Sequence, residues 1–188
     1  VGLIGDLTKT ATLKGAQAGD VLVLIGETKG SMGASLYARE ILGLKGEALG
    51  APPPVDLAVE KRNADFVRQL IENGLVSAVH DVSDGGIACA AAEMALASRL
   101  GVTLEGKLEA HELFAEDQAR FLLAVPIETY NAVRKEIDGA FQPSDWSNIK
   151  IGTFSTGGRL LTRYFDLPMA VIRDANEDWL PGYMNTVD

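Results

Sequence analysis

LVSAVHDVSDGGIACAAAEMALAS, residues 75–98, predicts a strand, a loop and a helix in direct succession. Its first five residues predict a short strand that ends at Val79, and the polar loop 80–86 follows. The helix after the loop is rich in alanine, and small side chains allow a helix to lie close to a sheet. The stretch therefore indicates a protein of packed helices and strands in which polar groups gather where a strand meets a helix.

The segments around this stretch also alternate between strand and helix patterns. The five apolar residues at 21–25 predict a strand that is covered on both faces. Asp56 is placed to cap a helix whose apolar residues recur at helical spacing up to Asn73 and Gly74. Further strands are expected at 102–104, 120–125 and 149–154, helices at 36–42, 111–117 and 128–137, a hairpin from 160–164 and 169–172, and a tail that is helical from 176 until Pro181.

This alternation is less strict than in a doubly wound nucleotide-binding fold. The expected class is α+β, with a mixed sheet in a three-layer α/β/α arrangement that is partly ferredoxin-like. The chain has 188 residues, of which 47% are hydrophobic, which suits a single domain over 1–188 with its own core. It opens on Val1 rather than Met, in an apolar segment that predicts a strand already under way, so we expect a piece of a longer protein.

Composition excludes several classes of protein. No apolar run approaches the roughly 20 residues that cross a bilayer, and the N-terminus lacks the pattern of a signal peptide, so we expect a cytoplasmic protein. The net charge is −9 and Lys and Arg do not cluster, which disfavours general nucleic-acid binding. Cys89 has no partner for an intramolecular disulfide, and its spacing from His80 and His111 does not fit a structural zinc site.

The common nucleotide and hydrolase signatures are absent from the sequence. It contains no GxxxxGK[ST], GxGxxG, GxSxG or HExxH. The chemistry of this chain, if it has any, must therefore come from a less familiar arrangement of polar residues.

The loop 80–86 is the first candidate site. It places His80 and Asp81 at the end of a strand, Ser83 and Asp84 where a helix cap belongs, and Gly85 and Gly86 in the first helical turn. Helix N-termini attract anions and glycines permit close approach of a ligand, but two carboxylates repel a bare phosphate. We therefore expect either Mg²⁺ between a phosphate and Asp81 or Asp84, or ribose hydroxyls that donate to these carboxylates. In a purely structural interpretation, Asp84 caps the helix, His80 makes a structural hydrogen bond and the glycines form a tight turn.

Two further clusters are weaker candidates. The backbone N–H groups and hydroxyls of the loop 30–35, which includes Gly33 and Ser35, could hold an anion near Lys29, although a plain loop with a serine cap explains the same residues. The cluster 116–120 contains Glu116, Gln118 and Arg120 and is expected to form surface salt bridges rather than a catalytic group. Packing roles are expected for Trp146, Trp179 and Cys89.

The sequence resembles the C-terminal part of the phosphoribosylformylglycinamidine synthase family. The resemblance is carried by HDVSDGGIA at 80–88, which Ala92-Glu93-Met94 follows. GASLY at 33–37 is similar to the glycine-serine-tyrosine loop of that family, FAEDQARF at 114–121 to its FGEDQARF-type segment, and GLIGD at 2–6 to the start of its final domain. The related aminoimidazole ribonucleotide synthetases have a loop of different sequence at the position of 80–86.

The resemblance implies that this chain is the last C-terminal-type domain of a protein with two tandem pairs of domains, similar in fold to the C-terminal domain of aminoimidazole ribonucleotide synthetase. Such an enzyme would use ATP and Mg²⁺ to activate the amide oxygen of formylglycinamide ribonucleotide, after which ammonia displaces phosphate. The implied partners are the N-terminal domains of the same polypeptide, a glutaminase subunit that supplies ammonia, and a small bridging subunit.

The resemblance also implies which domains bind ligands. The catalytic histidine of the family, and most residues for ATP, Mg²⁺ and substrate, belong to the earlier domains, so no catalytic residue is assigned here. The candidates for nucleotide or substrate binding in this chain come from the pattern of its residues and are His80, Asp81, Ser83, Asp84, Gly85, Gly86, Gly33 and Ser35, with Glu116, Gln118 and Arg120 as secondary candidates and Asp84 as a Mg²⁺ ligand through the nucleotide. Ala34 stands where the Gly-Gly-Ser loop of the family has its second glycine. The alternatives are a domain of another synthetase of the superfamily, for aminoimidazole ribonucleotide or selenophosphate, and a non-catalytic scaffold.

Overall fold

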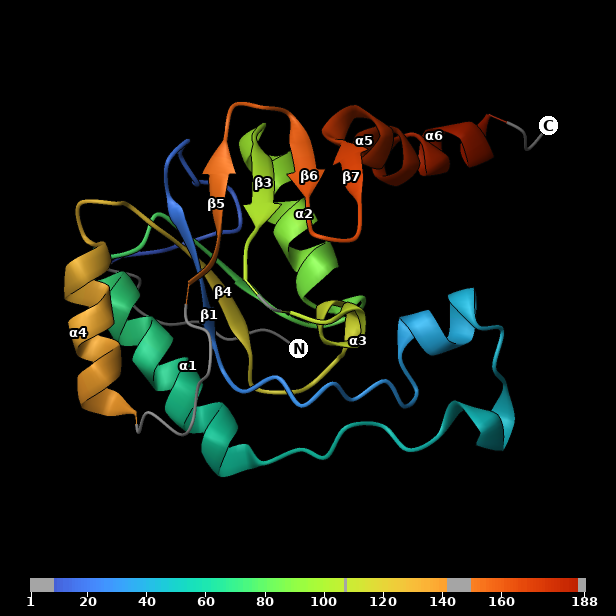
Figure 1. Ribbon diagram of the computed structural model, residues 1–188, viewed down its shortest axis with the longest axis horizontal. Coiled ribbons are helices and arrows are strands. Elements are labelled where there is room, and N and C mark those ends of the chain that lie inside the picture. The colour runs from blue at the N-terminus through green and yellow to red at the C-terminus, as the bar shows by residue number, and fades with distance from the viewer. Residues whose placement is uncertain (1–8, 107, 142–149, 186–188) are drawn as a thin grey trace.

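A single mixed sheet organises the part of the chain that the computed structural model describes, residues 9–106, 108–141 and 150–185 (Figure 1). Its strand order is β2-β4-β1-β5-β3-β6-β7, and all pairs are antiparallel except β3 with β6. The strands are β1 (Val21–Ile25), β2 (Ala78–Asp81), β3 (Gly101–Leu104), β4 (Phe121–Val125), β5 (Lys150–Ser155), β6 (Arg159–Leu161) and β7 (Asp166–Pro168). The expected α+β class with a mixed sheet is confirmed.

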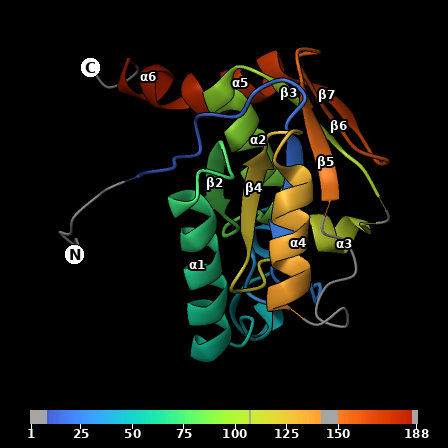
Figure 2. The same cartoon turned by 90° about the vertical axis from the view of Figure 1, so that its left-hand side faces the viewer.

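The central strand β1 shows why helices cover both faces of the sheet. All five of its residues are buried. Val21, Val23 and Ile25 pack with residues of helices α1 (Leu57–Glu72) and α4 (Tyr130–Ala140). Leu22 and Leu24 point to the other face, because successive side chains of a strand alternate, and there they pack with residues of helix α2 (Gly86–Ser98). The result is the expected arrangement of three layers, with α1 and α4 on one side of the sheet and α2 on the other (Figure 2).

Helix α2 lies close to the sheet because its side chains are small. Its buried residues include Ile87, Ala90, Ala91, Met94 and Ala95, which form the predicted apolar stripe, and also Ala88 and Ala92 beside that stripe. Helix α1 begins as predicted, since Oδ1 of Asp56 accepts hydrogen bonds from the backbone N–H groups of Ala58 and Val59 at 2.9 and 3.1 Å.

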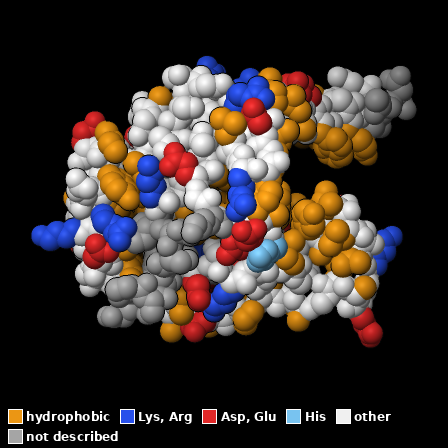
Figure 3. All heavy atoms as spheres, in the orientation of Figure 1, with side chains coloured by type: hydrophobic (Ala, Val, Ile, Leu, Met, Phe, Trp, Pro, Cys, Tyr) orange, Lys and Arg blue, Asp and Glu red, His pale blue; other side chains and the backbone are white. Residues whose placement is uncertain are grey.

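The connection between β1 and α1 forms a projection at one side of the molecule (Figure 1). A π-helical turn at Tyr37–Ile41 lies within the expected helix 36–42, and a short 3-10 turn follows at Gly46–Leu49. The expected short helix at 111–117 is α3 (Ala110–Phe114). Exposed apolar side chains lie on this projection and on the C-terminal helices (Figure 3), among them Ile41, Leu42, Leu180 and Tyr183.

Some boundaries differ from the sequence predictions. Strand β2 begins at Ala78 rather than at residue 75 and includes His80 and Asp81, because they pair with Leu122 and Phe121 at an edge of the sheet, where polar side chains are tolerated. The prediction of a second hairpin strand at 169–172 is wrong. The strand that pairs with β6 is β7, and Met169 begins helix α5 (Met169–Glu177) and is buried in the core.

The C-terminal helix corrects two further expectations. Helix α6 (Trp179–Met184) continues past Pro181, because a proline in the first turn of a helix removes an N–H group that has no intrahelical acceptor. Trp179 is 67% exposed and stacks on Tyr183 with ring centroids 5.5 Å apart, so the packing role predicted for it is wrong. Trp146 and the predicted first strand lie outside the described residues. Among the described helices, none is long and apolar enough to cross a bilayer.

Candidate functional site

Three segments that are distant in sequence meet at one end of the sheet. Strand β4 lies between β1 and β2 and runs antiparallel to both, so the first residue of β4 faces the last residues of its neighbours. Phe121 pairs with Ile25 on one side and with Asp81 on the other. The loops that leave β1 and β2, which contain the first two candidate sites, therefore flank the segment 115–120 that leads into β4.

Glu116 joins the two loops. Its Oε1 atom accepts a hydrogen bond from the backbone N–H of Leu36 at 2.8 Å and a second from the backbone N–H of Gly85 at 2.9 Å. The backbone N–H of Glu116 donates in turn to the carbonyl of Ser31 at 3.2 Å. A single side chain thus forms hydrogen bonds with the backbone of both the loop at 30–36 and the loop at 80–86.

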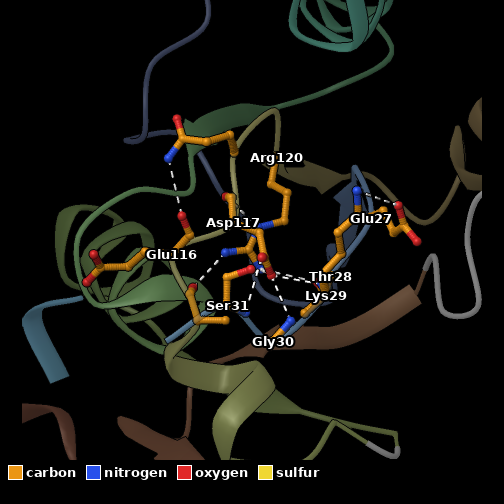
Figure 4. Close-up of polar contacts among 10 residues, drawn as sticks. Glu27, Thr28, Lys29, Gly30, Ser31, Glu116, Asp117 and Arg120 are labelled. Carbon is orange, nitrogen blue, oxygen red and sulfur yellow. Dashed lines mark hydrogen bonds and ion pairs between the residues drawn. The ribbon is translucent and has the colours of Figure 1, made fainter. Parts of the chain in front are cut away.

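Asp117 occupies the anion site that the sequence predicts at the loop 30–35 (Figure 4). Its carboxylate accepts hydrogen bonds from the backbone N–H groups of Lys29, Gly30 and Ser31 at 2.8, 3.0 and 3.2 Å. The residue is 4% exposed. Burial by itself raises the pKa of Asp117, but the hydrogen bonds from Ser31, Lys29 and Gly30 and the charge of Arg120 outweigh it, so the pKa lies below its usual value. The N–H groups here bind an anion that belongs to the protein.

Arg120 anchors this segment from inside the protein. Its side chain is fully buried, and its guanidinium donates to the carbonyl of Asp117 at 3.0 Å, to Oγ1 of Thr28 at 3.1 Å and to the carbonyl of Ala115 at 2.6 Å. Burial lowers the pKa of Arg120, and the charges of Asp117 and Glu116 oppose that effect. The prediction that 116–120 forms surface salt bridges is therefore wrong, because Asp117 and Arg120 are interior groups. Gln118 is exposed, and its Nε2 donates to the carbonyl of Glu116 at 3.2 Å.

Sequence reasoning missed Asp117, which lies between two of the proposed candidates. It also missed Glu93, the partner of His80. The sequence does contain a signal for Asp117. Its cluster lies between Phe114-Ala115 and an apolar strand, so its charged residues stand next to segments that are expected to be buried. A buried charge needs a partner, which makes Asp117 and Arg120 a candidate pair.

The first turn of α2 depends on two glycines with left-handed backbone conformations. Gly85 has a φ of +77° and Gly86 a φ of +69°. A Cβ at Gly86 would lie 2.5 Å from the carbonyl oxygen of Ala115, and one at Gly85 would overlap Sγ of Cys89. Cys89 thus lies directly against Gly85; it is half-buried, and burial and the charges of nearby carboxylates raise the pKa of its thiol.

The backbone N–H groups of Gly85 and Gly86 in this turn already have acceptors. The N–H of Gly85 donates to Glu116, and that of Gly86 donates to the carbonyl of Ser83 at 3.0 Å. Gly85 itself is the N-cap residue, so the structural interpretation that Asp84 caps the helix is wrong. These two N–H groups are therefore not available to bind a phosphate at the start of α2.

The side chains of the loop 80–86 leave a different kind of surface. Asp81, Ser83 and Asp84 are exposed, while His80 is largely buried. Nε2 of His80 lies 2.7 Å from Oε2 of Glu93, and Nδ1 lies 3.3 Å from Oδ1 of Asp81. The imidazole therefore makes the structural hydrogen bond that the alternative interpretation predicts. Exposed carboxylates and a hydroxyl suit hydroxyl donors or a cation better than an unaccompanied anion.

The residues 33–35 shape their loop from inside. A Cβ at Gly33 would overlap the carbonyl oxygen of Ala51. Ala34 has a φ of +55°, and its N–H donates to the carbonyl of Leu49 at 2.8 Å. Ser35 is completely buried, and its hydroxyl donates to the carbonyl of Met32 and accepts from the N–H of Ala38. These contacts match the serine-cap interpretation of this loop.

No group of three or more His, Cys, Asp or Glu side chains within the described ranges is arranged to hold a metal ion. Mg²⁺ is commonly held by one or two carboxylates, water and substrate phosphates. The exposed carboxylate of Asp84 fits such a site only when a phosphate supplies further ligands. Beside Asp117 lies a cavity of about 290 Å³, lined in part by Glu27, Lys29, Asp56 and Gln118.

We expect the stability of the chain to fall at acidic pH because of Asp117. The pKa of this carboxyl is lower in the folded state than its ordinary value of about 3.9. Its stabilising effect is therefore fully present above that value and is lost as the pH falls through the lower pKa of the folded state. Urea unfolding between pH 7 and pH 3 should show a shallower loss of stability for Asp117→Asn. Asp138→Asn, at an exposed ion pair of α4, serves as the control; equal slopes for Asp117→Asn and the wild type would contradict the expectation.

Comparison with known proteins identifies similar sequences. Residues 17–144 match the family described as AIR synthase related protein, C-terminal domain. Two relatives carry the name phosphoribosylformylglycinamidine synthase subunit PurL. The protein from Caulobacter vibrioides is 45% identical over 98% of this chain and 24% of its own length, and that from Parvibaculum lavamentivorans is 44% identical over 98% and 25%. The chain thus spans about a quarter of the length of these relatives.

Solved structures of Thermotoga maritima PurL show the same fold. PurL complexed with FGAR matches with a TM-score of 0.66 and 19% identity over 86% of this chain and 29% of that one. PurL complexed with ATP matches with a TM-score of 0.61 and 17% identity over 86% and 27%. The assembly PurLQS matches with a TM-score of 0.60 and 18% identity over 85% and 26%.

Proposed function

This chain belongs to the family of AIR synthase related proteins, C-terminal domain, and from that premise we propose that it is the C-terminal domain of a phosphoribosylformylglycinamidine synthase. The observation that carries the proposal is the 45% identity, over 98% of the chain, to a protein of that name. The whole enzyme is then an ATP-dependent carbon–nitrogen ligase of de novo purine biosynthesis. It converts formylglycinamide ribonucleotide, ATP and glutamine-derived ammonia to formylglycinamidine ribonucleotide, ADP and phosphate.

The reaction transfers a phosphoryl group and then replaces it. The amide oxygen of the substrate takes the γ-phosphoryl group of ATP and releases ADP. Ammonia then attacks the activated carbon, which loses phosphate together with that oxygen and becomes an amidine. Catalysis of this kind depends on positioning and on charge neutralisation. In this proposal the catalytic residues belong to the preceding domains, and the present chain contributes part of the wall of a ligand cleft.

The role of the present chain follows from its exposed side chains. Asp81, Ser83 and Asp84 face solvent at the end of β2, in the loop that Glu116 binds through Gly85. Their oxygen atoms suit hydroxyl groups of a ribonucleotide, and Asp84 suits a Mg²⁺ ion that a nucleotide phosphate also binds. When bound, such an ion supplies positive charge that neutralises phosphate oxygens. Gly33, Ser35, Gly85 and Gly86 act through the shape of the two loops, because a Cβ does not fit at the three glycines and Ser35 is completely buried.

The partners follow from the same proposal. The preceding domains of the same polypeptide complete the cleft, a glutaminase subunit supplies ammonia, and a small bridging subunit joins the two. The name PurLQS of the solved Thermotoga maritima assembly supports a complex with further subunits. Substrates and product are small soluble molecules, so we place the enzyme in the cytoplasm.

An activity measurement tests the proposal. The full-length protein that contains this chain is expected to form formylglycinamidine ribonucleotide from ATP, formylglycinamide ribonucleotide and ammonia. Residues 1–188 alone are expected to give no turnover, because they lack the catalytic groups. An inactive full-length protein, assayed with its subunits, would refute the ligase proposal, and product formation by the isolated chain would refute the assignment of catalysis to other domains.

We expect Asp84→Asn in the full-length enzyme to weaken the binding of nucleotide or substrate by roughly tenfold, because a hydrogen bond to a charged group contributes about 1.5–3 kcal/mol. Isothermal titration calorimetry with an ATP analogue and with formylglycinamide ribonucleotide measures the effect. Asp138→Asn on the exposed surface of α4 is the matched control. Wild-type affinity for both ligands in a folded Asp84→Asn protein would remove Asp84 from the site.

One observation favours a second function, that of a non-catalytic scaffold. Backbone donors in both candidate loops bind Glu116, Asp117 and Ser83 within the protein, among them those of Gly30, Ser31, Gly85 and Gly86. A full-length enzyme with His80, Asp81 and Asp84 replaced together would then keep normal activity. The ligand-cleft proposal predicts a large loss in the same experiment.

A further inference from the structure

We propose that Glu116 is a positioning residue that sets the distance between the two ligand loops of this domain. The inference rests on the proposed ligase function and assigns to Glu116 a role distinct from ligand contact. Its side chain is the link between the loop after β1 and the loop after β2, and both loops carry candidate binding residues.

The contacts of one oxygen atom carry the argument. Oε1 of Glu116 accepts from the N–H of Leu36, which directly follows Ser35, and from the N–H of Gly85, which directly follows Asp84. Leu36 and Glu116 are 80 residues apart in the sequence, and Gly85 and Glu116 are 31 residues apart. Both donors are backbone groups, so the carboxylate fixes the course of the chain in each loop rather than the conformation of a side chain.

Glu116 is itself rigidly placed. Arg120 donates to the carbonyl groups of Ala115 and Asp117, the two residues on either side of Glu116. Asp117 is tied to three backbone N–H groups of the first loop, and the backbone N–H of Glu116 donates to Ser31 in that loop. The buried arginine and aspartate therefore fix the backbone from which Glu116 reaches the second loop. A displacement of Glu116 would change the distance between the two loops.

The chemistry of the acceptor distinguishes positioning from a simple charge effect. Glu116→Gln keeps a carbonyl oxygen at the same reach and can accept from both N–H groups without the negative charge. Glu116→Ala removes the acceptor and leaves both donors without it. Glu116→Asp keeps the charge, but its side chain is one methylene shorter and does not span both loops. A displacement of about 1 Å in a positioned group can cost on the order of a hundredfold in rate.

The test uses the full-length enzyme with these three variants and Glu128→Ala as the matched control. Glu128 is exposed and follows β4 at the opposite end from Glu116. Steady-state kinetics with ATP, formylglycinamide ribonucleotide and ammonia give KM and kcat for each ligand. Hydrogen exchange, followed by mass spectrometry on peptides that contain Leu36 and Gly85, reports the two hydrogen bonds without reference to activity.

We expect Glu116→Ala to raise KM for a ligand of the cleft by roughly 10- to 100-fold, with a smaller change in kcat, and to speed exchange at both amides about tenfold or more. Glu116→Gln should restore both readouts to within about threefold of wild type, and Glu128→Ala should change neither. If Glu116→Ala does not fold, Glu116→Asp takes its place and should show the same two changes.

Two results would overturn the inference. The first is a wild-type KM and wild-type exchange rates in Glu116→Ala, or in Glu116→Asp if that variant replaces it. The second is equal impairment of Glu116→Gln and Glu116→Ala, which would show that the charge of Glu116 matters rather than its acceptor oxygen. Failure of the ligase proposal is recognised separately, because a wild-type enzyme without ligase activity refutes that proposal while the exchange data still decide whether Glu116 links the loops.

Discussion

Arg120→Ala is expected to lower the free energy of unfolding by about 3–5 kcal/mol, because it removes one partner of a buried ion pair. The guanidinium is fully buried, and the substitution would leave the carbonyls of Ala115 and Asp117 without their donor inside the protein. The Asp117 carboxylate would lose its nearby positive charge, and the lost side-chain volume would leave a cavity. Urea unfolding monitored by circular dichroism measures the change.

Two controls define what the arginine contributes. Arg120→Lys keeps the positive charge but lacks the planar fork of donors, so it should recover only part of the loss. Arg134→Ala breaks an exposed ion pair with Asp138 on α4 and should cost less than about 1 kcal/mol. A cost for Arg120→Ala as small as that for Arg134→Ala would show that the buried network does not stabilise the fold.

Gly86→Ala is expected to destabilise the chain by roughly 3 kcal/mol, the sum of left-handed backbone strain and steric overlap. Gly86 has a φ of +69°, and an added Cβ would lie 2.5 Å from the carbonyl oxygen of Ala115 and 2.8 Å from that of Leu113. Both are backbone atoms that cannot rotate away. Relief of the overlap requires the start of α2 to move away from the segment that contains Glu116. Thermal and urea unfolding measure the effect.

Gly43 provides a closely matched control. Its φ is +65°, nearly that of Gly86, but an added Cβ would meet no atom within 4 Å. Gly43→Ala should therefore cost only the backbone strain, about 1 kcal/mol. The difference between the two variants isolates the cost of the steric overlap, and equal costs would mean that α2 moves without penalty.

The fold was largely predictable where local pattern and burial agree. The apolar run at 21–25, the cap at Asp56 and the alanine-rich helix after Gly86 each indicate their element directly. The predictions failed where tertiary contacts decide the outcome. His80 and Asp81 extend β2 because they pair with β4, and Met169 begins a helix although an apolar run of its length is also typical of a strand.

The candidate site was predicted less completely, because its residues are joined by contacts that no sequence spacing shows. The two loops and the cluster 116–120 were each identified, but nothing in their spacing indicates that Asp117 would fill the anion site of one loop or that Glu116 would bond to both. Charged residues are most often exposed, which made surface salt bridges the natural expectation for Arg120. Burial of that arginine is decided by the ends of β1 and β2, which lie beside β4.

The link between distant loops also has a consequence for the order of folding. Closing a long stretch of chain costs entropy before any contact compensates for it. The hydrogen bonds from Leu36 and Gly85, which lie 80 and 31 residues before Glu116 in the sequence, therefore form only after β4 has docked between β1 and β2. The helices can begin from contacts within their own segments, whereas the two loops are brought together in the same long-range step that pairs β4 with β1 and β2. A molecule in which β4 has not yet paired would therefore lack both the centre of the sheet and the fixed arrangement of the loops at 30–36 and 80–86.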